Sequence, residues 1–226
     1  MIHIFDVDHT LYQGSTVMDY LHHSIARGTL PPGLLRRIPG LTFLFLAGRG
    51  NEAVTGKDFP FLKGLRKEDL RKAAEELFSA RMVWRLNIPL LDMIASLKER
   101  GETVILASSS FAFLLEPLSA HLSADHLIAT ELEYDGDLTT GRLSGVPAFG
   151  GGKLDRIASF LSGAGKEGLG SCSFYTDSHR DLPLLEAVGF PVAVNPDRRL
   201  GRIAKKRKWE IVRSSFRKSA QEGLPC

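Results

Sequence analysis

The chain begins with Met1-Ile-His-Ile-Phe-Asp6-Val-Asp8-His-Thr10-Leu11, in which a short apolar run leads into two aspartates one residue apart. Residues 2–5 contain β-branched and aromatic side chains and no glycine or proline, which predicts a buried strand. Asp6 then falls at the end of the strand, and Asp8 points the same way if the chain stays extended. Two such carboxylates repel each other unless a cation or a shared proton compensates. A lone motif of this kind would instead be read as a pair of solvated turn residues.

Three further polar motifs follow downstream, each at a predicted strand end or helix start. Thr103-Val-Ile-Leu-Ala107 is predicted to be a strand that ends in Ser108-Ser109-Ser110. Gly150-Gly-Gly152-Lys153 opens a predicted helix. Ser173-Phe-Tyr-Thr176 is predicted to be a third strand, and it ends in Asp177-Ser-His-Arg-Asp181. The order along the chain is therefore an acid pair, a hydroxyl group, a lysine and a second acid pair.

From residue 88 onward the sequence alternates between helical and strand patterns. Helices are predicted over 90–100, 111–121, 154–161, 181–188 and 198–208, and strands over 126–130 and 191–194, with a hairpin over 132–143 that turns at Asp135-Gly136. Such alternation predicts a doubly wound parallel α/β sheet covered on both faces. Ligands in these sheets bind outside the carboxyl ends of the strands, where Asp6, Ser108 and Asp177 are expected to lie.

Residues 12–86 interrupt this alternation with helical periodicity and few strand signals. One helix is predicted around residues 17–25 and another over 66–82, and proline-rich breaks separate them. We therefore predict an α/β core over 1–13 and 87–226, and a helical insert over 14–86. The apolar run Leu41 to Ala47 is expected to be helix core rather than a site for an apolar leaving group.

The four motifs, in this order, resemble those of the haloacid dehalogenase-like hydrolases, and within them the phosphoserine phosphatase-like branch. The resemblance covers nearly the whole chain and implies a Rossmann-like core with a helical cap over the active site. It implies that Asp6 attacks phosphorus and forms an aspartyl-phosphate intermediate. It also implies that Asp8 protonates the leaving group and then activates water. Ser108 would hydrogen-bond a phosphoryl oxygen, and Lys153 would offset the negative charge.

The same resemblance implies a magnesium site. Carboxylate and water oxygens suit Mg²⁺, which often also binds a substrate phosphate. The implied metal-binding residues are Asp6, Asp8 through its backbone carbonyl, and Asp177, with Asp181 as a direct or water-mediated ligand.

Each of these residues also has a purely structural interpretation. Any of the three serines could cap the following helix, and Lys153 could be a solvated residue in a first helical turn. Asp177 and Asp181 could cap the helix that begins near Leu182. His9 and His179 lie beside the acid pairs, and we expect pocket-lining or loop positions for both. Seven scattered histidines show no spacing typical of zinc sites.

One position departs from the phosphoserine phosphatase pattern. That branch typically places a glutamate nine residues after the nucleophile to hold the amino group of the substrate, and this chain has Ser15 there. An ammonium group buried without its carboxylate partner would be unfavourable. We therefore predict a phosphatase for small phosphomonoesters that does not favour phosphoserine. The alternatives are a phosphotransferase with the same aspartyl-phosphate, and a non-catalytic binding protein that retains the fold. A dehalogenase is disfavoured because that chemistry does not need the metal-binding acids.

Composition and charge indicate the compartment and partners. The 226 residues include two cysteines, which provide no disulfide framework, and the start of the chain has no signal-peptide pattern. A cytoplasmic enzyme acting on a phosphorylated metabolite is expected, with no membrane span and no nucleic-acid partner. Residues 198–226 carry ten Lys or Arg against two Asp or Glu. This excess is interpreted as a solvated helix face and terminus rather than as a nucleic-acid or membrane surface.

Overall fold

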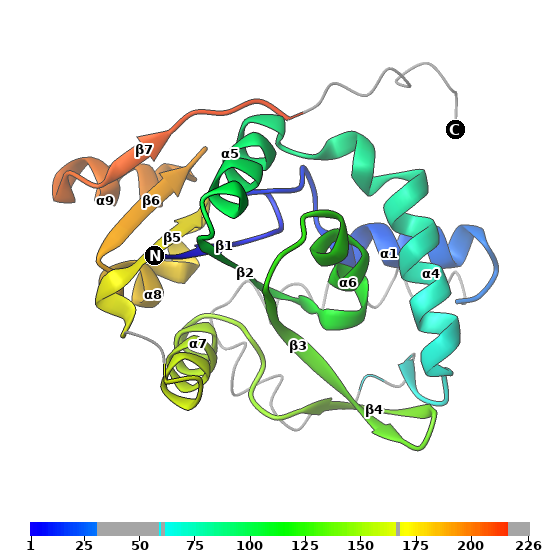
Figure 1. Ribbon diagram of the computed structural model, residues 1–226. Coiled ribbons are helices and arrows are strands. Elements are labelled where there is room, and N and C mark those ends of the chain that lie inside the picture. Colours follow the sequence, from blue (N-terminus) through cyan, green and yellow to red (C-terminus); the bar gives the residue numbers. More distant parts are fainter. Residues whose placement is uncertain (31–58, 60–61, 166–167, 217–226) are drawn as a thin grey trace.

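The computed structural model describes residues 1–30, 59, 62–165 and 168–216 (Figure 1). Its strands form one seven-stranded sheet in the order β4-β3-β2-β1-β5-β6-β7. The strands are β1 (Ile2–Phe5), β2 (Thr103–Phe111), β3 (His126–Asp135), β4 (Leu138–Ser144), β5 (Cys172–Thr176), β6 (Phe190–Val194) and β7 (Glu210–Val212). Neighbouring strands are parallel except β3 and β4, which form an antiparallel hairpin. The predicted doubly wound sheet is confirmed.

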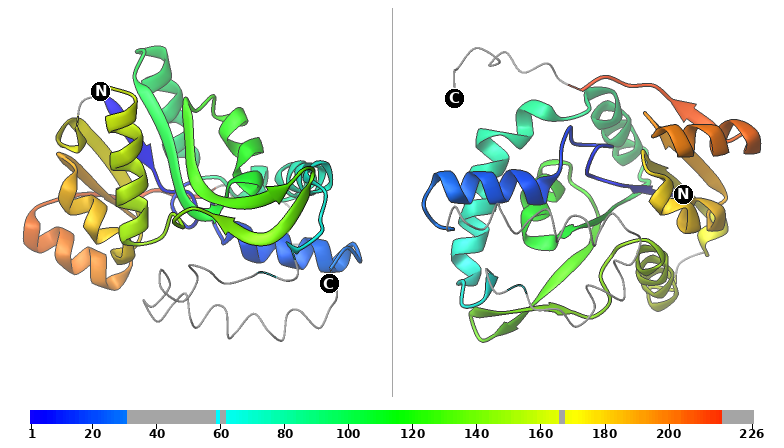
Figure 2. Two further views of the ribbon diagram at one scale, coloured as in Figure 1. Left: turned by 90° about the horizontal axis from the view of Figure 1, so that it is seen from below. Right: turned by 180° about the vertical axis from the view of Figure 1, so that it is seen from behind.

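Helices cover both faces of this sheet (Figure 2). The helices α5 (Ile88–Glu99) and α6 (Ala112–His121) lie on one face, and α7 (Gly151–Gly163), α8 (Leu182–Ala187) and α9 (Arg198–Arg207) lie on the other. Successive residues of β1 point to opposite faces of the sheet and belong to two different hydrophobic clusters. Phe5 packs with α5 and α6, whereas Ile4 packs with α7, α8 and α9. This burial on both faces explains why the central strands carry apolar residues on both faces.

The chain order changes direction in the sheet between β1 and β5. Strands β2, β3 and β4 extend to one side of β1, and β5 then pairs with its other side. In doubly wound folds the crevice for a ligand lies at this change, beyond the carboxyl ends of the two strands. Asp6 directly follows β1 and Asp177 directly follows β5. The topology therefore brings the two acid motifs, far apart in sequence, to one crevice.

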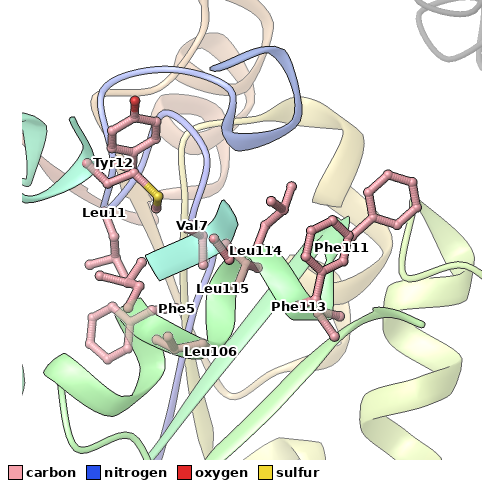
Figure 3. Packing of buried hydrophobic residues seen from close by; sticks show 14 of the residues in the cluster. Phe5, Val7, Leu11, Tyr12, Leu106, Phe111, Phe113, Leu114 and Leu115 are labelled. Carbon is pink, nitrogen blue, oxygen red and sulfur yellow. The ribbon is translucent and has the colours of Figure 1, made fainter. Parts of the chain in front are cut away.

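A helical insert follows the first strand, as expected. It contains α1 (Thr16–Ala26), α4 (Lys67–Ala80) and the 3₁₀ turn η3 (Met82–Arg85). Both helices pack beside α6 and share its hydrophobic cluster (Figure 1). The rings of Tyr20 in α1 and Phe113 meet edge to face, with their centroids 5.4 Å apart. Phe113 also stacks on Phe111, and Figure 3 shows these two rings side by side. The apolar run over 41–47 lies outside the described residues.

Two predicted boundaries were wrong. The strand expected to end at Ala107 continues as β2 to Phe111, because β3 extends alongside it and Phe111 pairs with Thr130 after a register shift. The Thr130 hydroxyl also donates to the Ser109 carbonyl at 2.8 Å, so the serines belong to the sheet. The hairpin turn lies at Gly136-Asp137, one residue later than predicted. Gly136 has φ 57°, a conformation that glycine adopts without a steric penalty. No helix among the described residues has the length and apolar character needed to cross a membrane.

Candidate active site

A tight turn after β1 positions the first acid pair. The Asp6 N–H donates to the Tyr175 carbonyl at 2.9 Å, which extends the pairing of β1 with β5. The chain then folds around the Val7 carbonyl, which accepts hydrogen bonds from the N–H groups of Leu11 and Tyr12, both at 2.9 Å. The turn begins at His9, after the acid pair, and Asp6 and Asp8 line the same cavity.

The cavity has a volume of about 220 Å³ and contains both predicted acid pairs. Its charged lining residues are Asp6, Asp8, Asp177, Asp181, Lys153 and Arg180. Negative groups thus outnumber positive ones. The structure therefore brings together five of the six predicted site residues, and the sixth, Ser108, is placed differently, as described below.

Lys153 connects the two acid motifs. It lies in the first turn of α7, and its Nζ is 2.8 Å from Asp6 Oδ1 and 2.9 Å from Asp181 Oδ2. All three side chains are buried. The Thr176 hydroxyl also donates to Asp181 Oδ2 at 2.8 Å, which fixes that carboxylate. The interpretation of Lys153 as a solvated helix residue is therefore wrong.

Glycine allows Lys153 to approach this closely. A Cβ at Gly152 would clash with the Pro147 carbonyl oxygen, so the first turn of α7 can pack there only with glycine. The Gly-Gly-Lys motif therefore has a steric role as well as an electrostatic one.

Burial and the neighbouring charges raise the pKa values of Asp6 and Lys153. Burial raises the pKa of Asp6 to about 8, although Lys153 opposes the shift. For Lys153, burial favours the neutral amine, but the carboxylates of Asp181 and Asp6 outweigh it and raise its pKa above the usual value. Lys153 thus stays a cation, and the protonated form of Asp6 is favoured unless further positive charge enters the site.

Thr10 links Asp6 to Asp177. Its hydroxyl lies 3.3 Å from Asp6 Oδ2 and 3.3 Å from Asp177 Oδ1, and it accepts the Asp177 N–H at 3.0 Å. A hydroxyl carries one proton, so it donates to only one of these carboxylates at a time. Burial raises the pKa of Asp177 to about 6. The Thr10 hydroxyl therefore orients the carboxylates of Asp6 and Asp177 but, being neutral, supplies no positive charge to offset theirs.

Asp8 has a separate set of partners. The backbone N–H of Thr16, the first residue of α1, donates to Asp8 Oδ1 at 3.1 Å. The Ser110 hydroxyl donates to Asp8 Oδ2 at 2.9 Å, and the Thr16 hydroxyl donates to Ser110 at 2.6 Å. Burial raises the pKa of Asp8, while these hydrogen bonds oppose the shift. Asp8 is therefore held apart from the cluster of Asp6, Lys153 and Asp181.

Comparison with known proteins identifies the family. A family model described as haloacid dehalogenase-like hydrolase matches residues 4–186. The chain belongs to this family.

Relatives of this haloacid dehalogenase-like hydrolase include named phosphatases. It is 31% identical over 237 residues to phosphoserine phosphatase SerB1 of Mycobacterium tuberculosis, covering 98% of this chain and 73% of the relative. It is 31% identical over 149 residues to histidinol-phosphatase of Neisseria meningitidis serogroup C, covering 65% and 67%. A crystal structure of a protein of unknown function from Bordetella pertussis matches with a TM-score of 0.82 and 30% identity, covering 93% and 97%. The chain is thus a phosphatase of the phosphoserine phosphatase-like branch.

The three serines of this hydrolase take different positions. Ser109 lines the cavity, Ser110 contacts Asp8, and the Ser108 hydroxyl accepts the Ser110 N–H at 3.1 Å. Ser108 is 1% exposed and is absent from the cavity lining within the described residues. Its predicted contact with a phosphoryl oxygen stays a prediction. Helix capping by Ser108 and Ser110 is wrong, because their hydroxyls have these other partners and α6 begins after Phe111.

The two histidines beside the acid pairs also separate. His9 lines the cavity with φ 62°, which places it on the tight turn. His179 Nδ1 lies 2.8 Å from Asp197 Oδ2, away from the cavity lining. Asp197 in turn caps α9 by accepting the N–H groups of Arg199 and Leu200, both at 2.8 Å. His179 therefore has a structural partner, whereas His9 borders the site.

Three buried residues that contact the acids of the site were not recognised as site residues from the sequence. Thr10, Thr16 and Ser110 are each buried and each contact an acid of the site. Thr10 stands two residues after Asp8 and four after Asp6, so its place in the first motif could have signalled a contact with Asp6. For Thr16 and Ser110 the sequence contains no such local signal.

The donor chemistry of the site fits a divalent cation. The described residues contain no ready-made cluster of three His, Cys, Asp or Glu side chains around one metal position. However, Asp6 and Asp177 converge on Thr10, and burial raises the pKa values of both. Asp181 is engaged by Lys153 and Thr176, which suits a role at one remove from a metal. Carboxylates that are buried, close together and short of positive charge suit Mg²⁺.

Proposed function

We propose that this phosphatase hydrolyses small phosphomonoesters, with Mg²⁺, through an aspartyl-phosphate on Asp6. The observation that carries the proposal is the position of Asp6 between a cation and an acid. Lys153 holds one carboxylate oxygen, while the other faces Asp177 across the Thr10 hydroxyl. A nucleophile beside a phosphate dianion needs its charge offset in this way.

The chemistry assigns one step to each acid of the first motif. An oxygen of Asp6 forms a bond to phosphorus while the bond from phosphorus to the ester oxygen breaks. Asp8, protonated at that stage, gives its proton to the leaving alkoxide. Asp8 then accepts a proton from water, the water oxygen attacks phosphorus, and inorganic phosphate leaves as the Asp6 carboxylate is restored. The two roles require two separate carboxyl groups, which matches the separate hydrogen-bond partners of Asp6 and Asp8.

The residues that would hold Mg²⁺ are Asp6 and Asp177, with the backbone carbonyl of Asp8 and with Asp181 at one remove. The ion supplies positive charge that lowers the repulsion between phosphate and carboxylates. Lys153 provides a fixed cation on the opposite side of Asp6. Ser108 is proposed to contribute to phosphoryl binding, with Ser109 the hydroxyl residue that already borders the cavity.

Small substrates are proposed because the cavity is small and the insert lies against it. We propose that residues 14–86 form the cap of a core made of 1–13 and 87–226. Ser15 at the start of this cap lines the cavity, and it offers a hydroxyl where an ammonium group would need a carboxylate. Phosphoserine is therefore expected to be no better than other small phosphates. SerB1 and histidinol-phosphatase, named for different substrates, are similarly related to this chain.

The test is hydrolysis of a panel of phosphorylated metabolites and an aryl phosphate, by purified protein with EDTA or with added Mg²⁺. EDTA should abolish turnover, and Mg²⁺ should restore it. Asp6→Asn should reduce turnover to background with an unchanged circular dichroism spectrum. The matched control is Asp92→Asn, an exposed acid on α5, which should behave like wild type.

Full activity of Asp6→Asn would refute the covalent route, and activity unaffected by EDTA would refute the metal requirement. Phosphate transfer to added alcohols exceeding hydrolysis would favour a phosphotransferase.

A further inference from the structure

Asp8 is attached to two segments that meet only in the folded chain. One carboxylate oxygen accepts the backbone N–H of Thr16, and the other accepts the hydroxyl of Ser110. Thr16 is the first residue of α1, and Ser110 lies near the end of β2, 94 residues later in sequence. Both side chains are almost completely buried, at 0% and 2% exposure.

The direction of these hydrogen bonds follows from chemistry. Each Asp8 oxygen has a lone pair that can accept, whether the carboxyl group is ionised or carries the proton that it donates, so the Ser110 hydroxyl is the donor in this contact. The Ser110 oxygen is then left to accept, and the Thr16 hydroxyl, 2.6 Å away, donates to it. Thr16 therefore contacts Asp8 twice, directly through its N–H and indirectly through Ser110. Removing one hydroxyl would leave Asp8 with one fixed oxygen and freedom to rotate about its side-chain bonds.

We propose that Ser110 and Thr16 are positioning residues that hold the Asp8 carboxyl in line with the leaving-group oxygen. The inference rests on the proposed role of Asp8 in proton transfer. It deepens that role, because it makes the first turn of α1 and the end of β2 part of the machinery for proton donation. Proton donors act efficiently only within hydrogen-bond reach of the atom that receives the proton, so a small displacement of Asp8 would slow the reaction.

Packing gives this attachment a rigid support. Tyr20, one turn along α1 from Thr16, contacts the ring of Phe113 in α6, which directly follows β2. The helix that carries Thr16 is thus fixed to the segment that carries Ser110. A change in the position of α1 would move the N–H and the hydroxyl of Thr16 relative to Asp8 and Ser110, so the position of the insert affects the position of the proton donor.

The test compares two substrates that differ in their need for an acid. An alkyl phosphate has a poor leaving group that must be protonated, whereas a dinitrophenyl phosphate has a leaving group stable as an anion. In Ser110→Ala, kcat/KM for the alkyl phosphate should fall by about tenfold to a hundredfold, part of the contribution of a general acid. The kcat/KM for the activated aryl phosphate should stay close to wild type, because this parameter reports the steps up to release of the first product.

Variants of Thr16 supply a second test if Ser110→Ala does not fold. Thr16→Val keeps the N–H but loses the hydroxyl, and it should show the same dependence on leaving group in weaker form. Thr16→Ser retains the hydroxyl and should restore the wild-type ratio. The control for loss of a buried strand serine is Ser173→Ala on β5, which is 4% exposed and contacts Met1 rather than the site. It should leave both substrates unchanged.

The outcomes separate this inference from the proposed function. If Asp8→Asn retains alkyl-phosphate turnover, the proposed role of Asp8 is wrong. If Asp8→Asn loses that turnover while Ser110→Ala and Thr16→Val match wild type, the role stands and the positioning inference is wrong. Equal losses for both substrates in Ser110→Ala would also overturn the inference, because they would indicate a general structural defect.

Discussion

Replacing Asp177 by asparagine removes a buried negative charge and is expected to stabilise the metal-free protein at neutral pH. Burial raises the pKa of this acid from 3.8 to about 6 in the folded protein. An acid with a raised folded pKa destabilises the protein increasingly as pH rises from the unfolded pKa, and the full penalty is present above the folded pKa. The relevant window is therefore pH 4 to 6. Below it the acid is neutral in both states.

The size of the effect follows from the shift. A rise of about two pKa units corresponds to roughly 3 kcal/mol of destabilisation above pH 6. Asparagine keeps the shape of the side chain, but its hydrogen bond with Thr10 is weakened, which costs about 1 kcal/mol. The net gain is then about 2 kcal/mol, or about 4–8 °C in Tm for a chain of this length. Catalysis should be lost at the same time, because a proposed metal ligand is removed.

The assay is thermal unfolding of wild type and Asp177→Asn at pH 4 and pH 8 in EDTA, repeated with Mg²⁺. The variant should exceed wild type at pH 8 in EDTA and lose this advantage at pH 4. Added Mg²⁺ should stabilise wild type by mass action and leave the variant almost unchanged. Asp92→Asn serves as the control for removal of an exposed charge. A lower Tm for Asp177→Asn at pH 8 in EDTA, or equal Mg²⁺ stabilisation of both proteins, would refute the reasoning.

Three further changes test individual contacts. Gly152→Ala should reduce kcat by at least about tenfold with a modest loss of Tm, because the added Cβ meets the Pro147 carbonyl and shifts Lys153; wild-type kcat would contradict the steric role. Thr10→Val should weaken the apparent Mg²⁺ affinity by about 10–100-fold, measured by Mg²⁺ titration of turnover, since it orients both proposed ligands; an unchanged affinity would exclude that role. Ser15→Glu should raise kcat/KM for phosphoserine relative to a phosphate without an amino group, and an unchanged ratio would show that this position does not read the substrate.

The parts of the site that are local in sequence were predictable, and those that depend on distant contacts were not. Asp6 and Asp177 stand directly after apolar strands, so the strand pattern alone placed them at one edge of the sheet. Thr10 stands close to Asp6 in sequence, but its contact with Asp177, 167 residues away, is one that no local pattern reveals. The run of three serines offered three equivalent hydroxyls, and only the folded strand shows that Ser109 lines the cavity while Ser110 contacts Asp8.

Some structural details also depended on packing rather than on local pattern. The strand β2 continues beyond its apolar residues into the three serines, because β3 pairs with this part of the strand as well. The turn that follows Asp8, in which the Val7 carbonyl accepts the N–H groups of Leu11 and Tyr12, was not predicted, because its hydrogen bonds join backbone groups and leave no pattern of side chains.

Direct trapping of the phosphorylated enzyme tests the central claim most directly. The enzyme would be mixed with an activated aryl phosphate and Mg²⁺, quenched in acid during the first turnover and treated with borohydride, which reduces an acyl phosphate to an alcohol. Peptide mass spectrometry would then locate the modified side chain. The proposed mechanism predicts a single modified residue, Asp6, and none in a sample without substrate. Modification of Asp8, a serine or a histidine instead, or active turnover with no modified residue at any quench time, would contradict it.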